Sequence, residues 1–322
     1  MGRRIRHFEP DGLYLVTNRC AGAKYLLTPS ADTNRIIRGA LARYASIYDV
    51  ELFAWMFMGN HFHLIVRSES LEIPRFVGNM QQNISQEIQR TTRWNLRVFP
   101  RRYSAERILD TPTLWETINY VLMNPVRADL VAHPRDWPGV SSFELHDAGG
   151  TMEGRYLNRT KLGRLRRQAD DTTQIEREQA METFEVGWTA PPSASSKDEA
   201  NEHILDDLDT RCEQEADRRR ALGIDPLGAE GVQTQSIQAS PEAPARSPEP
   251  LCHASDERQE EQYHEHHARV TDSYRQALDR WQQGRTDVSF PPGTYPPGWL
   301  EAIPIAPSEH THASERIRGD PN

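Results

Sequence analysis

Two histidines in alternation are the residues whose types and spacing most directly suggest chemistry. His61 and His63 lie within an apolar run from Leu52 to Val66, which is otherwise interrupted only by Gly59-Asn60. Side chains two residues apart on a strand point to the same face, so both imidazoles are expected on one side of a sheet. Without a cysteine ligand nearby, two imidazoles leave open positions on a divalent ion, which favours a catalytic metal site. The alternative is a pair of structural histidines.

A tyrosine and an asparagine further along the chain complete the candidate set. Tyr120 and Asn124 stand four residues apart, so a helix places them on one face. A phenol has a pKa of about 10, and a tyrosine nucleophile therefore needs a cation or a metal nearby. The pattern suggests a metal-assisted tyrosine nucleophile. The alternative is a core tyrosine beside the apolar stripe of Trp115, Ile118 and Leu122, with Asn124 as a helix cap.

The elements that must position these side chains alternate along the first 150 residues. Alternating and helical apolar spacing predicts a strand, a helix, a hairpin, a second long helix, a short strand and a third helix. Pro125 is expected to end the third helix at Asn124. This order predicts an α+β sandwich of one sheet covered by helices. The predicted elements span 12–19, 33–48, 50–58, 61–67, 73–92, a strand ending near 109, and 113–123.

Charge separates the two halves of the chain. Residues 1–150 have a net charge of +3 and the remainder −12, which together give the −9 of the whole chain. Arginine outnumbers lysine 17 to 1 in residues 1–150, and its planar fork suits phosphate contact and base stacking. The arginine cluster between Asn95 and Leu109 therefore favours a nucleic acid partner, although a solvated charged face is the ordinary role of such clusters.

Other sequence features exclude several classes of protein. The three cysteines are far apart and show no CxxC spacing, which argues against a zinc knuckle or a disulfide framework. No apolar stretch approaches the ~20 residues that cross a bilayer, and the basic N-terminus is not followed by a signal-type hydrophobic region. We therefore expect a cytoplasmic protein.

Composition predicts four segments. Residues 1–150 are expected to form the catalytic domain and 151–185 a charged connecting segment. Residues 186–256 are expected to be a mostly disordered linker with a helix near 201–220. Residues 257–322 are predicted to be a helix followed by a proline-rich extended tail, docked through its aromatic side chains, with Tyr263–His267 in a solvated helix rather than at a metal site.

Three blocks of the chain resemble a known family. Asn60-His-Phe-His-Leu-Ile-Val66 is similar to the signature of single-tyrosine HUH transposases. Tyr103-Ser-Ala-Glu-Arg-Ile-Leu109 and Tyr120-Val-Leu-Met-Asn-Pro-Val-Arg-Ala128 resemble the insertion-sequence-200-like group, especially REP-associated tyrosine transposases. The similarity covers roughly residues 8–145. Gly59 departs from the proline that is common at this position, which we expect to alter the turn but not the chemistry.

The resemblance implies a fold and a set of roles. It implies a ferredoxin-like or RRM-like antiparallel sheet, with Tyr120 as nucleophile and His61, His63 and Asn124 as ligands of Mg²⁺ or Mn²⁺. Cleavage and rejoining would pass through a 5′-phosphotyrosine, without ATP. The implied substrate is single-stranded or hairpin DNA at REP elements, and the protein would be a nucleoid-associated monomer or homodimer. We expect DNA contacts from Arg101, Arg102, Arg107 and Arg127.

Two other functions fit parts of this pattern. A domesticated protein could bind DNA hairpins without cutting them, but binding alone needs neither the histidine pair nor Tyr120. A metal-dependent phosphodiesterase could use water in place of Tyr120 as the nucleophile. A covalent protein–DNA adduct distinguishes the transposase from both.

Overall fold

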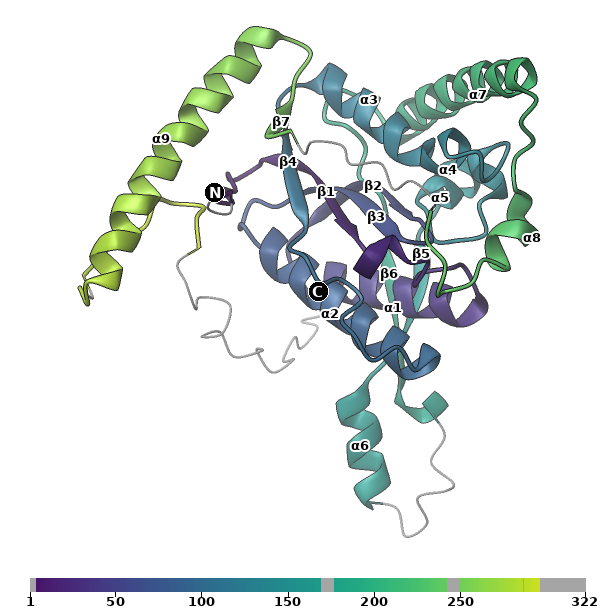
Figure 1. Cartoon of the computed structure of the whole chain (residues 1–322), viewed down its shortest axis with the longest axis horizontal. Coiled ribbons are helices and arrows are strands. Elements are labelled where there is room, and N and C mark those ends of the chain that lie inside the picture. Colours follow the sequence, from purple (N-terminus) through teal and green to yellow (C-terminus); the bar gives the residue numbers. More distant parts are fainter. Residues whose placement is uncertain (1–3, 169–176, 242–249, 286, 296–322) are drawn as a thin grey trace, which may run out of the picture.

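The computed structural model describes residues 4–168, 177–241, 250–285 and 287–295. Figure 1 shows the central sheet with helices on both faces, and the long helix α9 at one side. In the first part of the chain the elements are β1 (Leu13–Arg19), α1 (Ala31–Ile47), β2 (Glu51–Phe57), β3 (His61–Arg67), α2 (Ile73–Thr92), β4 (Ser104–Ile108), α3 (Thr111–Leu122), α4 (Asn124–Arg127) and α5 (Phe143–Ala148). These follow the predicted elements closely.

The main sheet has the strand order β2-β3-β1-β4-β7, where β7 (Cys252–His253) is a late addition at the edge. The first four strands are antiparallel to their neighbours, whereas β7 is parallel to β4. Two split β-α-β units with this strand order define a ferredoxin-like fold. The predicted α+β class and ferredoxin-like sheet are therefore confirmed.

The helices begin where the sequence provides capping residues. The Ser30 side chain accepts a hydrogen bond from the Thr33 amide at the start of α1, and Asp110 does the same for Thr113 at the start of α3. Helices α1 and α2 pack together on one face of the sheet, and α3 packs against β2 and β3 on the other (Figure 1). The His61 and His63 side chains lie on the α3 face.

A second, two-stranded sheet packs on α1. It consists of β5 (Met152–Leu157) and β6 (Met181–Val186), and α6 (Arg159–Gln168) extends from it away from the body (Figure 1). Gly39 and Gly154 allow the close approach, because a Cβ at Gly154 would lie 2.2 Å from the Arg38 carbonyl oxygen. The segment predicted as a charged connection is thus part of the fold. Its alternation of buried Met152 with exposed Glu153 is the strand signal within the charged composition.

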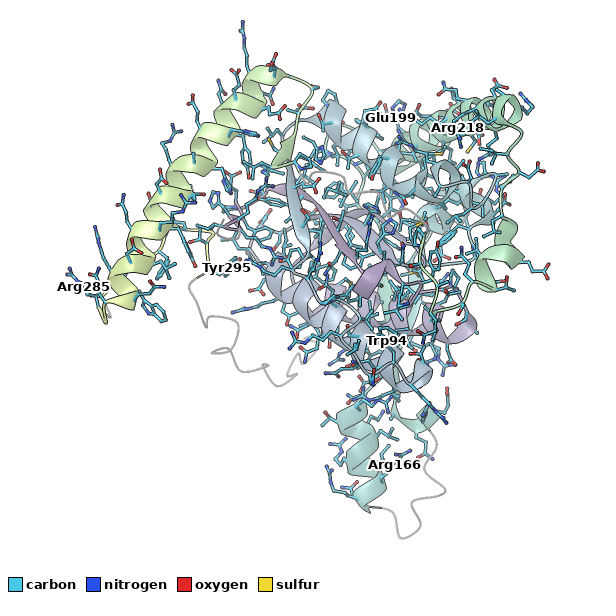
Figure 2. All side chains as sticks on the ribbon, in the orientation of Figure 1. Trp94, Arg166, Glu199, Arg218, Arg285 and Tyr295 are labelled. Atoms are coloured by element: carbon cyan, nitrogen blue, oxygen red, sulfur yellow. The ribbon has the colours of Figure 1, made fainter. Side chains whose placement is uncertain are left out.

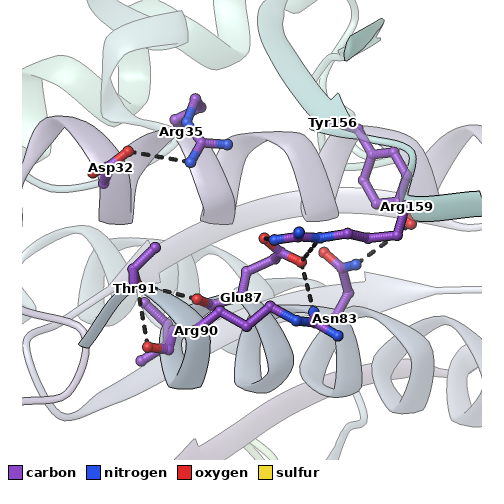
Figure 3. A network of polar contacts seen from close by, with 9 residues as sticks. Asp32, Arg35, Asn83, Glu87, Arg90, Thr91, Tyr156 and Arg159 are labelled. Carbon is purple, nitrogen blue, oxygen red and sulfur yellow. Dashed lines mark hydrogen bonds and ion pairs between the residues drawn. The ribbon is translucent and has the colours of Figure 1, made fainter. Parts of the chain in front are cut away.

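A buried carboxylate links this second sheet to α2. Glu87 is 5% exposed and forms ion pairs with Arg159, at 2.5 Å, and with Arg90, at 2.8 Å (Figure 3). Asn83 donates to the Tyr156 hydroxyl at 3.4 Å beside them. Burial alone would raise the pKa of Glu87, but the hydrogen bond and charge of Arg159 outweigh it and lower that pKa. The carboxylate is therefore charged and paired at neutral pH.

Among the described residues after 186, the chain contains more helix than the sequence predicted. Helix α7 (Lys197–Leu222) packs against α3, and α8 (Gly228–Gln233) follows it. The sequence prediction missed this packing because α7 buries only a narrow apolar stripe at four-residue spacing, and most of its other residues are charged or polar. The stripe consists of Ala200, Ile204, Leu208 and Cys212.

Helix α9 (Glu257–Gln282) docks on the N-terminal segment through one end. Tyr263 and His267 are buried, and the Tyr295 hydroxyl donates to the Leu71 carbonyl at 2.8 Å, whereas Trp281 is 45% exposed. Figure 2 shows Tyr295 between α9 and the sheet. Residues 296–322 of the predicted proline-rich tail lie outside the described residues. Within the described part of the chain, none of the helices combines the length and apolarity needed to span a bilayer.

Candidate active site

Strand β3 places the two imidazoles side by side. The ring centroids of His61 and His63 are 4.9 Å apart with their planes at 84°. On the neighbouring strand β1, Arg19 lies opposite His61 and Thr17 opposite His63. The sequence predicted that both histidines would lie on one face of a strand, and in β3 they do.

Asn60 fixes the orientation of the first imidazole. The Nδ1 atom of His61 lies 2.6 Å from the Oδ1 atom of Asn60, and the Nδ2 atom of Asn60 donates to the Ala23 carbonyl at 3.0 Å. Because a carbonyl oxygen only accepts, His61 must donate from Nδ1, which leaves Nε2 without a proton and able to accept. That is the tautomer a metal ligand needs.

Both histidines are held in the neutral form. Burial and the positive charge of Arg19 lower the pKa of His61 to about 4, although a hydrogen bond with Asn124 opposes the shift. Burial, His61 and Arg19 lower the pKa of His63 well below its ordinary value. Neutral imidazoles are the metal-binding form at physiological pH.

The junction of α3 and α4 brings the other two side chains to the histidines. Helix α3 ends at Leu122, and Asn124 begins α4, where Pro125 is tolerated in the first turn. The Nδ2 atom of Asn124 lies 3.3 Å from the Nε2 atom of His63. Asn124 thus starts a second short helix, whereas the sequence predicted it at the end of the first. In this position its amide reaches both imidazoles.

Tyr120 lies over the same site and is open to solvent. Its ring centroid is 5.5 Å from that of His63, edge to face, and the residue is 39% exposed. The guanidinium carbon of Arg127 lies 5.6 Å from the centre of the Tyr120 ring. Partial burial raises the pKa of the Tyr120 phenol, while Arg127 opposes the shift. The phenol is therefore protonated at neutral pH and needs activation to act as a nucleophile.

The four arginines predicted to contact DNA lie in three different settings. Arg127 is exposed beside Tyr120. Arg101 and Arg102 are exposed and lie just before β4. Arg107 forms an ion pair with Glu9 at 3.1 Å and donates to the carbonyl oxygens of Leu13 and Ile108. Its guanidinium is thus engaged within the fold.

Sequence reasoning missed two charged groups on the same face. The positive charge of Arg19 lowers the pKa of both imidazoles. Arg19 follows Thr17 by two residues on a predicted strand, so the sequence placed both side chains on one face, and the pairing of β1 with β3 makes this the face of the histidines. Glu106 is 6% exposed and lies 2.7 Å from Nε2 of His253 on β7. The pair lies on the Tyr120 side of the sheet, since Glu106 stands opposite Leu15 and raises the pKa of Tyr120.

Helix α7 supports the segment that carries Tyr120. Asn119 donates to Asp207, and Arg211 forms an ion pair with Glu116 at 2.9 Å. The buried Arg219 donates to the Val126 carbonyl at 3.3 Å. The α3–α4 junction is therefore held from both sides, by β3 and by a helix from the C-terminal half.

Comparison with known proteins gives a family match over part of the chain. Residues 26–121 match the family model described as "Transposase IS200 like". No curated protein matches the chain. One solved structure with some likeness is a REP-associated tyrosine transposase bound to a REP hairpin, at 19% identity and a TM-score of 0.37, covering 56% of this chain and 98% of that one.

A second solved structure is that of a "putative transposase" from Deinococcus radiodurans, with 15% identity and a TM-score of 0.26. It covers 36% of this chain and 92% of that one. Both scores are too low to establish a shared fold. The family match supports a role as a transposase, a DNA-processing enzyme. Over residues 26–121, the predicted resemblance to the IS200-like transposases is therefore confirmed.

Proposed function

We propose that this protein is a metal-dependent single-stranded DNA endonuclease and transposase that uses Tyr120 as its nucleophile. The observation that carries the proposal is the convergence of four side chains from two separate segments. The His63 ring lies 5.5 Å from the Tyr120 ring, and its Nε2 atom lies 3.3 Å from the Asn124 amide. His61 stands beside them with its Nε2 atom unprotonated.

His61, His63 and Asn124 would hold Mg²⁺ or Mn²⁺. The donor set fits such an ion, because two neutral imidazoles and an amide, whose oxygen can ligate after a flip, supply three ligands and leave positions for substrate. The orientation of His61 by Asn60 supports this fit. When bound, the ion supplies positive charge that polarises the scissile phosphate.

Tyr120 carries out the strand cleavage in this proposal. Its phenolic oxygen attacks the scissile phosphorus in line, the bond to the 3′ oxygen breaks, and a 5′-phosphotyrosine forms. The proton lost by the phenol is balanced by protonation of the released 3′ oxygen. Attack by another 3′-hydroxyl reverses the reaction and joins strands, so no ATP is consumed. Arg127, beside the phenol, would contact the charged phosphate.

The substrate class follows from the charge and the family. Arginine-rich surfaces near the site suit the DNA backbone. The similar solved protein is bound to a REP hairpin, and we propose hairpin-containing single strands here as well. Tyr120 and the imidazoles come from one chain, which supports a site that is complete within one subunit.

Covalent trapping tests the proposal. The full-length protein is incubated with Mn²⁺ and hairpin DNA labelled at its 3′ end, which stays with a 5′-phosphotyrosine, and a denaturation-resistant adduct is sought on a gel. We expect the adduct with the natural protein and its loss in Tyr120→Phe. Tyr48→Phe is the matched control, because Tyr48 lies at the far end of α1 and bonds Asn79.

Other outcomes identify the rival functions. Cleavage without an adduct would indicate water as the nucleophile. Tight hairpin binding without cleavage, with every hairpin and metal tried, would indicate a binding protein that no longer cuts.

A further inference from the structure

A cavity of about 600 Å³ lies at the open edge of β4, apart from the imidazoles. Its walls come from three distant parts of the sequence. They are the N-terminal segment 4–8, the segment 100–105 leading into β4, and the face of α9 that carries Tyr263 and His267. Strand β7 pairs only with Arg107 and Ile108, so the β4 edge at Ser104 and Ala105 is left to this cavity.

The cavity is lined by positive charge. Four arginines line it, and none of its described lining residues is acidic. This is unusual in a chain with a net charge of −9. The guanidinium groups of Arg101 and Arg102 make no hydrogen bond or ion pair with any described residue. Like charges that line one cavity repel one another, and an anion bound among them would reduce that repulsion. The lining arginines are Arg4, Arg6, Arg101 and Arg102.

Tyr103 forms part of the wall of the cavity. It lines the cavity and is 6% exposed, yet its buried hydroxyl has no hydrogen-bond partner in the described part of the chain. The guanidinium carbon of Arg6 lies 3.5 Å from the centre of its ring. Buried hydroxyls are normally paired, and an unpaired one costs about 1–3 kcal/mol. The hydroxyl oxygen is enclosed by the protein and does not open into the cavity.

The walls of the cavity are held in place by tertiary contacts. Nε2 of His267 lies 3.2 Å from the Ile5 carbonyl oxygen, and the Phe8 amide donates to the Gly293 carbonyl at 2.9 Å. Arg6 also donates to the Tyr103 carbonyl. The C-terminal segment thus fixes the N-terminal segment over the edge of the sheet and completes the cavity.

The sheet relates this cavity to the candidate active site. Thr17 of β1 lies opposite His63 on one side and opposite Ser104 on the other. Ser104 is a lining residue, and it stands two strands from His63. Neighbouring strands are about 4.8 Å apart, so the two backbones are separated by roughly 10 Å. A single strand of DNA that reaches His63 can therefore cross β4 a few nucleotides away.

We propose that this cavity binds a backbone phosphate of single-stranded DNA, a few nucleotides from the phosphate that is cleaved. The inference rests on the proposed function, because it assigns a second contact for the same substrate. Guanidinium forks bind phosphate oxygens in pairs, which suits a cavity lined by four arginines. A cavity of this volume accommodates one or two nucleotides rather than a bare inorganic ion.

Binding measurements in a Tyr120→Phe background test the cavity without cleavage. The affinity of the full chain for a fluorescein-labelled thymidine oligonucleotide of about 20 nucleotides is measured against salt concentration. Arg4→Gln with Arg102→Gln removes charge from two walls. The matched control is Arg166→Gln with Arg167→Gln on α6, which Figure 2 shows projecting away from the body. Tyr103→Phe keeps the ring and removes only the hydroxyl.

We expect the cavity double variant to bind at least about five-fold more weakly than the control pair. The slope of log affinity against log salt should fall by about 0.7 for each phosphate that the variant no longer neutralises. Tyr103→Phe should leave both the affinity and the slope unchanged, because its hydroxyl is enclosed. Equal affinity and equal slope in the double variant and the control would overturn the proposal. So would a lack of oligonucleotide binding by all of the proteins.

Competition separates the sources of phosphate. Inorganic phosphate and thymidine monophosphate, at matched ionic strength, should displace the oligonucleotide only weakly. Displacement by the mononucleotide at micromolar concentration would instead identify a free-nucleotide pocket and overturn the proposal.

The adduct assay keeps this inference distinct from the proposed function. If adducts form while the double variant binds like its control, the proposed phosphate site in the cavity is rejected and the proposed enzyme function is retained. If no adduct forms but the double variant still loses affinity, the phosphate site is retained and the proposed cleavage function is rejected.

Discussion

The ring of Tyr120 meets the ring of His63 edge to face at 5.5 Å, although the two residues come from different elements of the chain. The contact exists because α3 packs on the face of β3 to which His61 and His63 point. Had Tyr120 pointed to the opposite face, a second subunit would be needed to bring a phenol to the imidazoles. The arrangement makes several quantitative expectations possible.

Removing the amide of Asn60 should weaken metal binding. In Asn60→Ala, His61 loses the hydrogen bond that fixes its tautomer, and loss of such a partner lowers metal affinity about 10- to 100-fold. Titration of the full chain with Mn²⁺, followed by the paramagnetic resonance of free ion, measures this. Asn83→Ala on α2 serves as the control. Unchanged Mn²⁺ affinity in a folded Asn60→Ala protein would count against a metal role for His61.

Changing Asn124 should alter the same affinity in both directions. Asn124→Ala removes a proposed ligand and should weaken Mn²⁺ binding by about ten-fold or more. Asn124→Asp replaces a neutral oxygen with a charged one and should strengthen binding. The same Mn²⁺ titration measures both variants. If the two variants bound Mn²⁺ with equal affinity, Asn124 would not be a metal ligand, and its contact with His63 would be its only role at the site.

Arg127 should control the pH dependence of adduct formation. Its positive charge opposes the rise in the pKa of Tyr120, so Arg127→Gln should raise that pKa further. The rate of adduct formation at neutral pH should then fall, and the pH–rate profile should move to higher pH. Arg127→Lys retains a charge and should restore part of the rate. A pH–rate profile that does not move would show that the charge of Arg127 does not affect the pKa of the Tyr120 phenol.

Two glycines should differ sharply in their tolerance of alanine. Gly154→Ala places a Cβ 2.2 Å from the Arg38 carbonyl oxygen and should destabilise the fold by about 1–3 kcal/mol. Gly78→Ala lies on α2 with nothing within 4 Å of the added Cβ, and should be neutral or stabilising by about 1 kcal/mol. Urea denaturation measures both. Equal stability of the two variants would contradict the close packing of β5 on α1.

His146 should make the fold less stable in mild acid. Burial lowers its pKa to about 4, and its Nδ1 atom lies 2.9 Å from the Asn201 side chain. The unfolded histidine takes up a proton below about pH 6.5, whereas the folded one does not until about pH 4. Stability is therefore complete above pH 6.5 and falls as the pH drops toward 4, by an amount on the order of 2 kcal/mol.

Denaturation midpoints between pH 7 and 4.5 test this expectation. In His146→Gln the fall in stability over this range should be shallower than in the natural protein, because the remaining histidines still contribute. An identical pH dependence in the two proteins would exclude His146 as a source of the acid sensitivity.

The sequence by itself determined the local features of this protein. Alternation in β3 put His61 and His63 on one face, and helical spacing paired Tyr120 with the residue four places on, because both depend only on backbone periodicity. The succession of strands and helices along the first half of the chain followed from the same apolar spacing. Charge counting also indicated that arginines dominate this half.

The tertiary structure alone decided which of these features meet. Glu9 engages Arg107, and Asn60 fixes His61, through contacts that depend on how distant segments pack. The sequence did not reveal that α7 packs on the domain, because most of its residues are charged or polar. Its four buried apolar residues are enough to hold the helix only because α3 lies against them. The arginine-lined cavity could not be read from spacing, because its walls lie at opposite ends of the chain.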